Sequence, residues 1–295
     1  MKWHDLDRTK YFVLSFGAAF LVLLMLALCM ASLVNKPLPE ENIVDKTPAD
    51  AYYSPQEQDS LNVLIVASDE AGVPYSFFLT RLDVLRGEIP VAAFTPQTAV
   101  HYAGAPSTLA EVYAKNGAKA VKQALSEALG VDVQRYLAFK GDALAKALDT
   151  IGNVEYDLKT PLEYKTATGV TNLSAGRQLL DGTRFYDILR FALAAAPASE
   201  QNATASAELL AHYINSRLSA VLEPNADKIF SEVINLADSD ISFEDYDSRK
   251  EALVFLAKLS GRHARSVLVR GSWNKATGVM ELSASAGEVL SKMYG

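Results

Sequence analysis

Side chains able to do acid–base or metal chemistry are few in this sequence, and their spacing matches no common catalytic motif. The four histidines are isolated, and none has the H-E-x-x-H spacing that places two imidazoles on one helical face around zinc. The chain also lacks a G-x-S-x-G nucleophile elbow, a G-x-x-x-x-G-K-[ST] phosphate loop and a G-x-G-x-x-G fingerprint. Motifs alone therefore assign no catalytic residue.

Residues 11–34 form an uncharged apolar run that is long enough to cross a membrane. A transmembrane helix needs roughly 20 apolar residues, whereas the apolar core of a cleavable signal peptide has about 7–15. We therefore interpret the run as an uncleaved anchor. A lipoprotein signal at Cys29 is disfavoured, because Leu28 occupies a position that requires a small residue. Three basic residues precede the run and one follows it closely: Lys2, Arg8, Lys10 and Lys36. This asymmetry predicts a cytoplasmic N-terminus.

These features divide the chain into four parts. Residues 1–10 are predicted to be a cytoplasmic tail, residues 11–34 a transmembrane helix, residues 35–60 an extracytoplasmic stalk and residues 61–295 one domain. The stalk contains four prolines among polar residues, which favours extended chain. The sequence thus predicts a single-pass protein of the cell membrane with its bulk outside the cytoplasm.

Composition narrows the class of partner. The chain carries a net charge of −7 at pH 7, and this acidity argues against a nucleic-acid partner, which usually requires a basic surface. The only cysteine lies inside the apolar run, so the outer domain forms no internal disulfide. Exported domains without disulfides are common in Gram-positive bacteria, whereas small secreted eukaryotic domains are more often rich in them.

Alternating strand and helix patterns in the outer domain predict an α/β fold with three layers, in which helices flank a central mixed sheet. Residues 61–67 are a nearly continuous apolar run, typical of a strand buried on both faces. Further strands are predicted at residues 76–83, 89–95, 133–139, 153–158, 266–270 and 279–283. Helices are predicted from the T-L-A-E capping box at residues 108–111, at residues 118–129, 142–151, 182–195, 203–221, 226–237 and 244–259, and after a cap at residues 285–288.

Several short segments also follow one another in a characteristic order. They are N-V-L-I-V-A-S-D at residues 62–69, a hairpin ending at residue 98, G-V-D at 130–132, L-D-T-I-G-N-V at 148–154, and G-R-Q-L-L-D-G at 176–182 before I-L-R at 188–190. This order resembles the LytR-CpsA-Psr family. The resemblance covers about residues 60–295 and implies a membrane anchor, a stalk and an extracytoplasmic α/β domain.

Members of that family are phosphotransferases, which move a glycopolymer from a polyprenyl-pyrophosphate carrier to peptidoglycan with the help of Mg²⁺. Such chemistry needs carboxylates for the cation and several basic side chains for the pyrophosphate. By resemblance, Asp69 is a candidate metal ligand and Arg190 a candidate pyrophosphate ligand. The other positions at which the family carries charged groups fall on uncharged residues here, among Val73, Pro74, Tyr75, Ser76, Thr95, Pro96, Gln97, Thr98, Thr108, Ala192 and residues 201–206.

Simpler structural roles are open to the same residues. Asp69 can satisfy backbone amides in the loop after the first strand, Asp181 can cap a helix, and Arg190 can pair with Asp187. Thr108 is predicted to be a helix cap. The aromatic residues that follow the loop are predicted to pack in the core, with a lipid groove as the alternative: Tyr75, Phe77 and Phe78.

The loss of charged partners favours a catalytically degenerate protein of envelope assembly, which binds a polyprenyl carrier, a cell-wall polymer or a protein partner. One alternative is an active phosphotransferase that uses remote replacements: Arg81, Arg177 and Arg184. Another alternative is a structural or signalling ectodomain, which would have no open cleft. An enzyme requires basic side chains that converge on the cleft near Asp69 and Arg190, whereas a cleft filled by its apolar neighbours would disfavour transfer.

Overall fold

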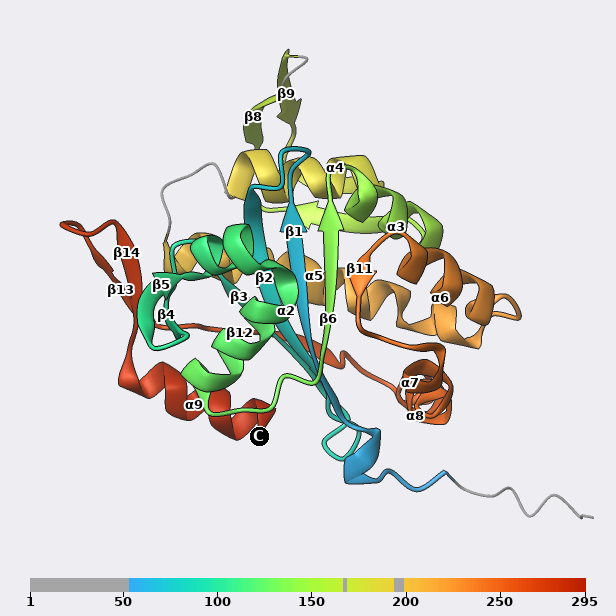
Figure 1. The fold of residues 1–295 in the computed structure, drawn as a ribbon. Coiled ribbons are helices and arrows are strands. Elements are labelled where there is room, and N and C mark those ends of the chain that lie inside the picture. The colour runs from blue at the N-terminus through green and yellow to red at the C-terminus, as the bar shows by residue number, and fades with distance from the viewer. Residues whose placement is uncertain (1–52, 167–168, 194–198) are drawn as a thin grey trace, which may run out of the picture. The chain divides into compact units, whose positions relative to one another are not determined.

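A six-stranded mixed sheet forms the centre of the domain (Figure 1). The computed structural model describes residues 53–166, 169–193 and 199–295, which belong to one compact unit. In spatial order the strands are β11 (Asp238–Ser239), β6 (Arg135–Lys140), β1 (Leu61–Ser68), β2 (Pro74–Leu82), β3 (Ile89–Phe94) and β12 (Ala264–Val267). The β1–β6 and β3–β12 pairs are parallel, and the β1–β2, β2–β3 and β11–β6 pairs are antiparallel. The predicted mixed sheet is therefore confirmed.

β1 is buried on both faces, as its continuous apolar run predicts. Leu64 and Val66 point into one hydrophobic core and are fully buried, while Ala67 belongs to the core on the opposite face. Successive side chains of a strand point to opposite faces, so a central strand needs apolar residues at nearly every position. This requirement explains why the sequence of β1 lacks the alternation of a half-exposed strand.

Helices cover both faces of the sheet and complete three layers (Figure 1). One core lies under α2 (Leu109–Leu129) and α9 (Ala284–Tyr294). The other is covered mainly by α3 (Ala143–Ile151), α4 (Gly182–Asp187), the π turn η2 (Ile188–Leu193) and α5 (Glu200–Arg217). The remaining helical segments are η1 (Glu57–Asp59), η3 (Leu218–Leu222), α6 (Ala226–Asn235), α7 (Phe243–Asp247) and α8 (Lys250–Lys258).

Four two-stranded ribbons surround these layers. They are β4 (Ala99–Tyr102) with β5 (Ala105–Thr108), β7 (Val154–Leu158) with β10 (Gly176–Leu180), β8 (Leu162–Thr166) with β9 (Gly169–Leu173), and β13 (Gly271–Asn274) with β14 (Val279–Leu282). The predicted strand at residues 153–158 is confirmed as β7, which pairs with β10 outside the central sheet. The strand predicted at residues 266–270 begins and ends earlier, as β12.

Two predicted helices in the first half form one element. α2 starts at the predicted capping box, where Thr108 Oγ1 accepts from the Glu111 amide at 3.3 Å, and it continues past a kink at Gly117. Gly117 has a φ of 76°, which glycine adopts without the steric penalty of a side chain, so it bends the helix without ending it. Gly130 ends the helix in the left-handed conformation, as predicted.

Later helices differ from the predictions at their ends. The helix predicted at residues 182–195 is α4 followed by η2, and its last two residues lie outside the described ranges. The single helix predicted at residues 244–259 is divided into α7 and α8. The cap of α9 is Ser283 and not Ser285, because the Ser283 hydroxyl precedes the first helical residue and accepts from the Ala286 amide at 3.2 Å.

The two ends of the described unit both contact its interior elements, the first end at α8 and the last end at β1 and β2. Tyr53 packs on Phe255 with ring centroids 5.3 Å apart, so residues at the end of the predicted stalk contact the domain. At the other end, the Asn62 side-chain amide donates to the Tyr294 carbonyl oxygen at 2.6 Å, and the Tyr294 hydroxyl donates to the Leu79 carbonyl at 2.9 Å. These two hydrogen bonds hold the end of α9 against the sheet.

The transmembrane helix predicted at residues 11–34 lies outside the described residues. Within the ranges that are described, no helix is both long and apolar enough to span a bilayer.

Candidate functional site

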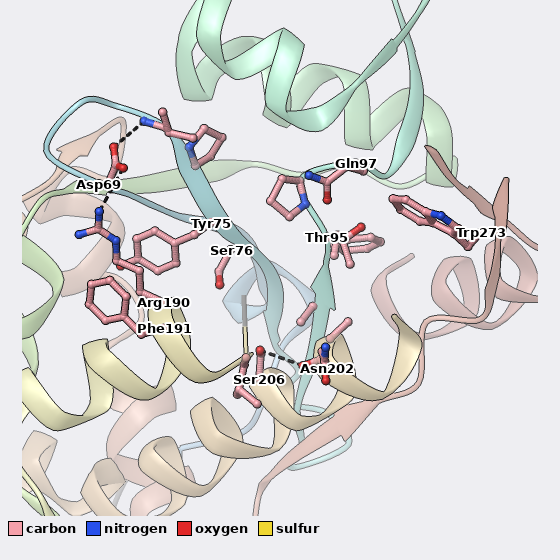
Figure 2. Close-up of a pocket in the computed structure, with 17 residues that line it drawn as sticks. Asp69, Tyr75, Ser76, Thr95, Gln97, Arg190, Phe191, Asn202, Ser206 and Trp273 are labelled. Atoms are coloured by element: carbon pink, nitrogen blue, oxygen red, sulfur yellow. Dashed lines mark hydrogen bonds and ion pairs between the residues drawn. The ribbon is translucent and has the colours of Figure 1, made fainter. Parts of the chain in front are cut away.

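A cavity of about 420 Å³ opens where β1 ends and β2 begins (Figure 2). We call it the polar cavity. Its walls come from the β1–β2 loop, the start of β2, the end of β3, η2, the start of α5 and the β13 strand. Its volume lies within the range of roughly 300–1,000 Å³ that is usual for ligand sites. The lining residues are Asp69, Val73, Pro74, Tyr75, Ser76, Ala93, Phe94, Thr95, Pro96, Gln97, Arg190, Phe191, Leu193, Asn202, Ala203, Ser206 and Trp273.

Asp69 is held in place by the loop that it begins. Its Oδ1 accepts from the Val73 amide at 2.9 Å, and its own amide donates to the Val73 carbonyl oxygen at 2.9 Å. Gly72, with a φ of 83°, allows the tight reversal between them. The predicted structural role of Asp69, which is to satisfy loop amides, is therefore confirmed. Its second oxygen, Oδ2, remains directed into the cavity.

Arg190 reaches that second oxygen from η2. Its Nη2 lies 3.1 Å from Asp69 Oδ2, and Nη1 donates to the Tyr186 hydroxyl (Figure 2 shows the Asp69–Arg190 pair). The guanidinium carbon also lies 4.8 Å from the Phe191 ring centroid, a distance at which the ring attracts a cation. Arg190 turns inward and pairs with Asp69, so the surface ion pair with Asp187 that the helical spacing suggests does not form among the described residues.

Tyr75 supplies the wall beside this ion pair. Its ring meets the Tyr186 ring edge-on with centroids 5.8 Å apart. Burial, followed by the nearby Tyr186 hydroxyl, raises the pKa of Tyr75 well above its usual range, so this hydroxyl stays protonated at neutral pH. Its oxygen is buried and makes no hydrogen bond within the described part of the chain. Tyr75 is thus a cavity wall, whereas Phe77 and Phe78 are core residues as predicted.

Charge in the polar cavity is balanced. Among the described residues, Asp69 and Arg190 are the only charged side chains that line it, and they neutralise each other. The three arginines considered as replacements do not line it. They bind elsewhere: Arg81 to Glu57 at 2.7 Å, Arg177 to Glu155 at 3.4 Å and Arg184 to the Leu179 carbonyl at 2.8 Å. The cavity therefore offers a multiply charged anion a single, already paired cation.

Asp69 fits Mg²⁺ poorly in this arrangement. Mg²⁺ usually takes one or two carboxylates together with substrate phosphates. Both oxygens of Asp69 already have donors, and one of those donors is a cation that repels a metal ion. The described residues contain no group of three or more His, Cys, Asp or Glu side chains that could hold a metal.

The other end of the polar cavity is neutral. Figure 2 shows Thr95, Gln97 and Trp273 there, apart from the ion pair. The Ser206 hydroxyl donates to the Asn202 carbonyl at 2.9 Å, and the Thr95 and Thr98 hydroxyls lie 3.2 Å apart. This end presents hydroxyls, an amide and an aromatic ring without net charge.

A second cavity of about 390 Å³ lies at the opposite end of the same strands. We call it the apolar cavity. It is bounded by the start of β1, the end of β2, α5, η3, α6 and α8. Its lining is mostly aliphatic and includes Leu61, Val63, Ile229, Val233 and Leu253. Three charged residues also line it: Arg217, Asp245 and Arg249.

Sequence reasoning placed two of these residues and missed others. The structure brings the predicted Asp69 and Arg190 together although 121 positions separate them. Tyr186 was missed, but its spacing of four residues from Arg190 is a helical contact that the sequence contains. Trp273 was missed because its strand, β13, was not predicted. Sequence gave no sign that this strand reaches the cavity.

Comparison with known proteins identifies a family over the first part of the domain, whereas the predicted resemblance extended to residue 295. A sequence model of the LytR_cpsA_psr family matches residues 35–195, which is more than half of the 295 residues and includes both Asp69 and Arg190. No curated protein matches the sequence.

Solved structures share the fold. A candidate transcription regulator from Eubacterium siraeum is 16% identical with a TM-score of 0.73, over 83% of this chain and 94% of that one. TagV of Bacillus subtilis is 13% identical with a TM-score of 0.64, over 81% and 97%. TagT of the same organism is 13% identical with a TM-score of 0.61, over 83% and 94%. At this identity the likeness concerns the fold alone.

Proposed function

This chain belongs to the LytR-CpsA-Psr family of cell-wall glycopolymer assembly, and we propose that it binds the polyprenyl carrier of that process without transferring the polymer. The proposal includes a membrane anchor at residues 11–34, with the N-terminus in the cytoplasm and the domain outside. The uncharged run and the basic residues that precede it support this placement.

The observation that carries the proposal is the pairing of Asp69 with Arg190. Phosphoryl transfer requires several positive groups around the pyrophosphate, because negative charge moves to the leaving oxygen in the transition state. In the polar cavity the single guanidinium is already neutralised at 3.1 Å, and the carboxylate that neutralises it repels phosphate. A pyrophosphate would have to displace Asp69 and would gain only one cation. Such a site is better suited to binding a group that is attached to the carrier than to transferring the glycopolymer.

The apolar cavity supports binding of the carrier chain. Each buried methylene contributes about 0.8 kcal/mol, so an isoprenoid segment gains affinity from the aliphatic lining without any charged contact. Val233 and Leu253 offer such a lining from two different helices. Recognition of the carrier is therefore assigned to its hydrocarbon and not to its pyrophosphate.

Binding of geranylgeranyl pyrophosphate to the full-length protein in nanodiscs tests this proposal. We expect affinity that EDTA does not change and that Arg190→Ala changes by less than about threefold. Val233→Asp should weaken binding by more than about tenfold, since it buries a carboxylate in the apolar cavity. Val289→Asp is the matched control, because Val289 is exposed on α9. Partition into the lipid is common to all variants, so the differences between them report the cavity.

Two outcomes would contradict the proposal. Mg²⁺-dependent binding that Asp69→Ala or Arg190→Ala abolishes would favour the active phosphotransferase. Equal binding by wild type, Val233→Asp and Val289→Asp would show that the carrier does not bind in the apolar cavity. The remaining interpretation would be an ectodomain that binds a partner.

A further inference from the structure

Trp273 stands at the neutral end of the polar cavity on a hairpin that is fixed to the cavity wall. The Met280 amide, on the opposite strand of the hairpin, donates to the Gln97 carbonyl oxygen at 2.9 Å. The Gly271 amide donates to Glu200 Oε1 at 2.6 Å, which ties the base of the hairpin to the start of α5. These contacts fix the backbone of the hairpin that carries Trp273 before any ligand arrives, and a preorganised backbone loses little entropy on binding.

Trp273 presents a large apolar side chain at the polar cavity. The residue is 38% exposed although tryptophan is among the largest apolar side chains, while its cross-strand partner Met280 is buried. Gln97 is also exposed on the cavity wall, and its side-chain amide makes no hydrogen bond among the residues described. An aromatic face and an unused amide therefore line one end of one cavity.

A neutral sugar ring matches this surface. One face of a pyranose is a layer of C–H groups, which packs against the electron-rich face of an aromatic ring, and its hydroxyls lie at the edge, within reach of amides and hydroxyls. An anionic sugar fits less well, because Arg190 is already paired with Asp69 and no second cation lines the described cavity wall. The residues 194–198, which are not described, carry no charged side chain in the sequence.

We propose that the Trp273 end of the polar cavity is a subsite for an uncharged sugar unit, with Trp273 as the stacking residue and Gln97 as a hydrogen-bonding partner. The inference rests on the proposed function, in that the sugar belongs to the glycopolymer attached to the carrier. It adds a specificity: the site selects neutral over anionic repeating units, because no unpaired cation lines the described wall of the cavity, and Trp273 supplies the stacking face for the sugar ring.

Fluorescence of the full-length protein tests the subsite directly. The chain has two tryptophans, Trp3 and Trp273, so Trp3→Phe leaves Trp273 as the single emitter. The probes are neutral tetrasaccharides of glucose, galactose and N-acetylglucosamine, with tetragalacturonate as the anionic counterpart. We expect at least one neutral probe to shift the emission to shorter wavelength with saturation, and tetragalacturonate to bind more weakly.

Variants separate stacking from general damage. By calorimetry, Trp273→Ala should abolish binding, whereas Trp273→Phe should retain part of it. Gln97→Ala should weaken binding roughly five- to tenfold, the effect of one hydrogen bond. Phe243→Ala removes another exposed aromatic ring, on α7, and should change nothing.

The inference is overturned if no neutral probe gives a saturable response, if tetragalacturonate binds as well as the neutral probes, or if Trp273→Ala binds like wild type. Geranylgeranyl pyrophosphate carries no sugar, so the two tests fail separately. Prenyl binding without sugar binding would contradict only the proposed subsite. Sugar binding without prenyl binding would contradict only the proposed carrier function.

Discussion

The two cavities of the domain lie at opposite ends of the same strands and differ in what they offer a ligand. β1 contributes Leu61 and Val63 to the apolar cavity, and Asp69 follows its last residue in the polar cavity. The apolar cavity offers hydrocarbon, and the polar cavity offers an ion pair, hydroxyls, an amide and an aromatic ring. One buried strand thus separates a site suited to a lipid chain from a site suited to a polar group.

That difference also separates binding from chemistry. Binding of hydrocarbon requires only apolar surface, which the apolar cavity has. Phosphoryl transfer requires an excess of positive charge, which the polar cavity lacks because Asp69 cancels Arg190. Added charge in one cavity, and the stability contributed by polar groups beside each cavity, test this difference.

The largest effect is expected from added cations. Val73→Arg with Pro96→Arg places two guanidinium groups on the wall of the polar cavity. Each hydrogen bond to a charged group contributes about 1.5–3 kcal/mol, less at an exposed position such as Val73, so affinity for inorganic pyrophosphate should rise roughly 10- to 100-fold by calorimetry. Leu268→Arg with Val289→Arg adds the same charge at exposed positions outside the cavity. An equal rise in that control would mean non-specific attraction.

The next effect concerns the ion pair beside the apolar cavity. Asp245 accepts from Arg135 Nε and Nη2 at 2.8 Å each, and these bonds lower the pKa of Asp245 to about 2. The folded pKa is below the unfolded value of about 3.9, so the pair stabilises the fold above pH 4, and this contribution is lost as the pH falls to about 2. Asp245→Asn should therefore lower the free energy of unfolding by about 1–2 kcal/mol at pH 7. Urea titrations should find the difference shrinking between pH 4 and pH 2, and a constant difference would contradict the pairing.

A smaller effect compares a threonine that lines the apolar cavity with one that lies behind the lining residue Thr95 of the polar cavity. Thr80 lines the apolar cavity with a buried hydroxyl that makes no hydrogen bond among the described residues, whereas the buried Thr98 hydroxyl lies 3.2 Å from that of Thr95. Removing an unsatisfied hydroxyl is favourable and removing a satisfied one is not. Thr80→Val should raise the free energy of unfolding by about 1 kcal/mol, and Thr98→Val should lower it by a similar amount. Thermal melts that shift in the same direction for both variants would contradict this assignment.

The smallest effect is the coupling between Asp69 and Arg190. Both side chains are partly exposed, at 22% and 27%, so solvent screens their attraction. A double-mutant cycle of Asp69→Ala and Arg190→Ala should give a coupling free energy of unfolding of about 0.5–1 kcal/mol, and 1 M salt should reduce it. A coupling near zero at low salt would show that the two charges do not neutralise each other in solution.

Sequence patterns predicted the elements that depend on local chemistry. The buried run of β1, the capping box at Thr108, the glycine stop at Gly130 and the N-cap at Asp181 are all confirmed, the last by a 2.8 Å bond from the Arg184 amide. Each of these depends on residues within a few positions of one another, and so the sequence contains the whole interaction.

Long-range pairing was the part that the sequence did not reveal. The short ribbons were mostly missed, since a two-stranded ribbon of four or five residues is stabilised by what it packs on rather than by its own pattern. The site shows the same limit: Arg190 can pair equally well with Asp187 in the sequence, and only the packing of η2 beside the β1–β2 loop selects Asp69. Trp273 reaches the cavity through a hairpin whose position depends on contacts with Gln97 and Glu200.

The hydrogen bond between the start of β1 and the end of α9 constrains the order in which the domain folds. Asn62 and Tyr294 are 232 positions apart, so the bond between them closes a loop that contains almost the entire domain. Chains are synthesised from the N-terminus, and contacts of such long range form slowly because their loop-closure entropy must be overcome first. The Asn62 side chain at the start of the first strand therefore lacks this partner until the last helix has been made, and we expect the domain to complete its fold in a late, cooperative step after synthesis.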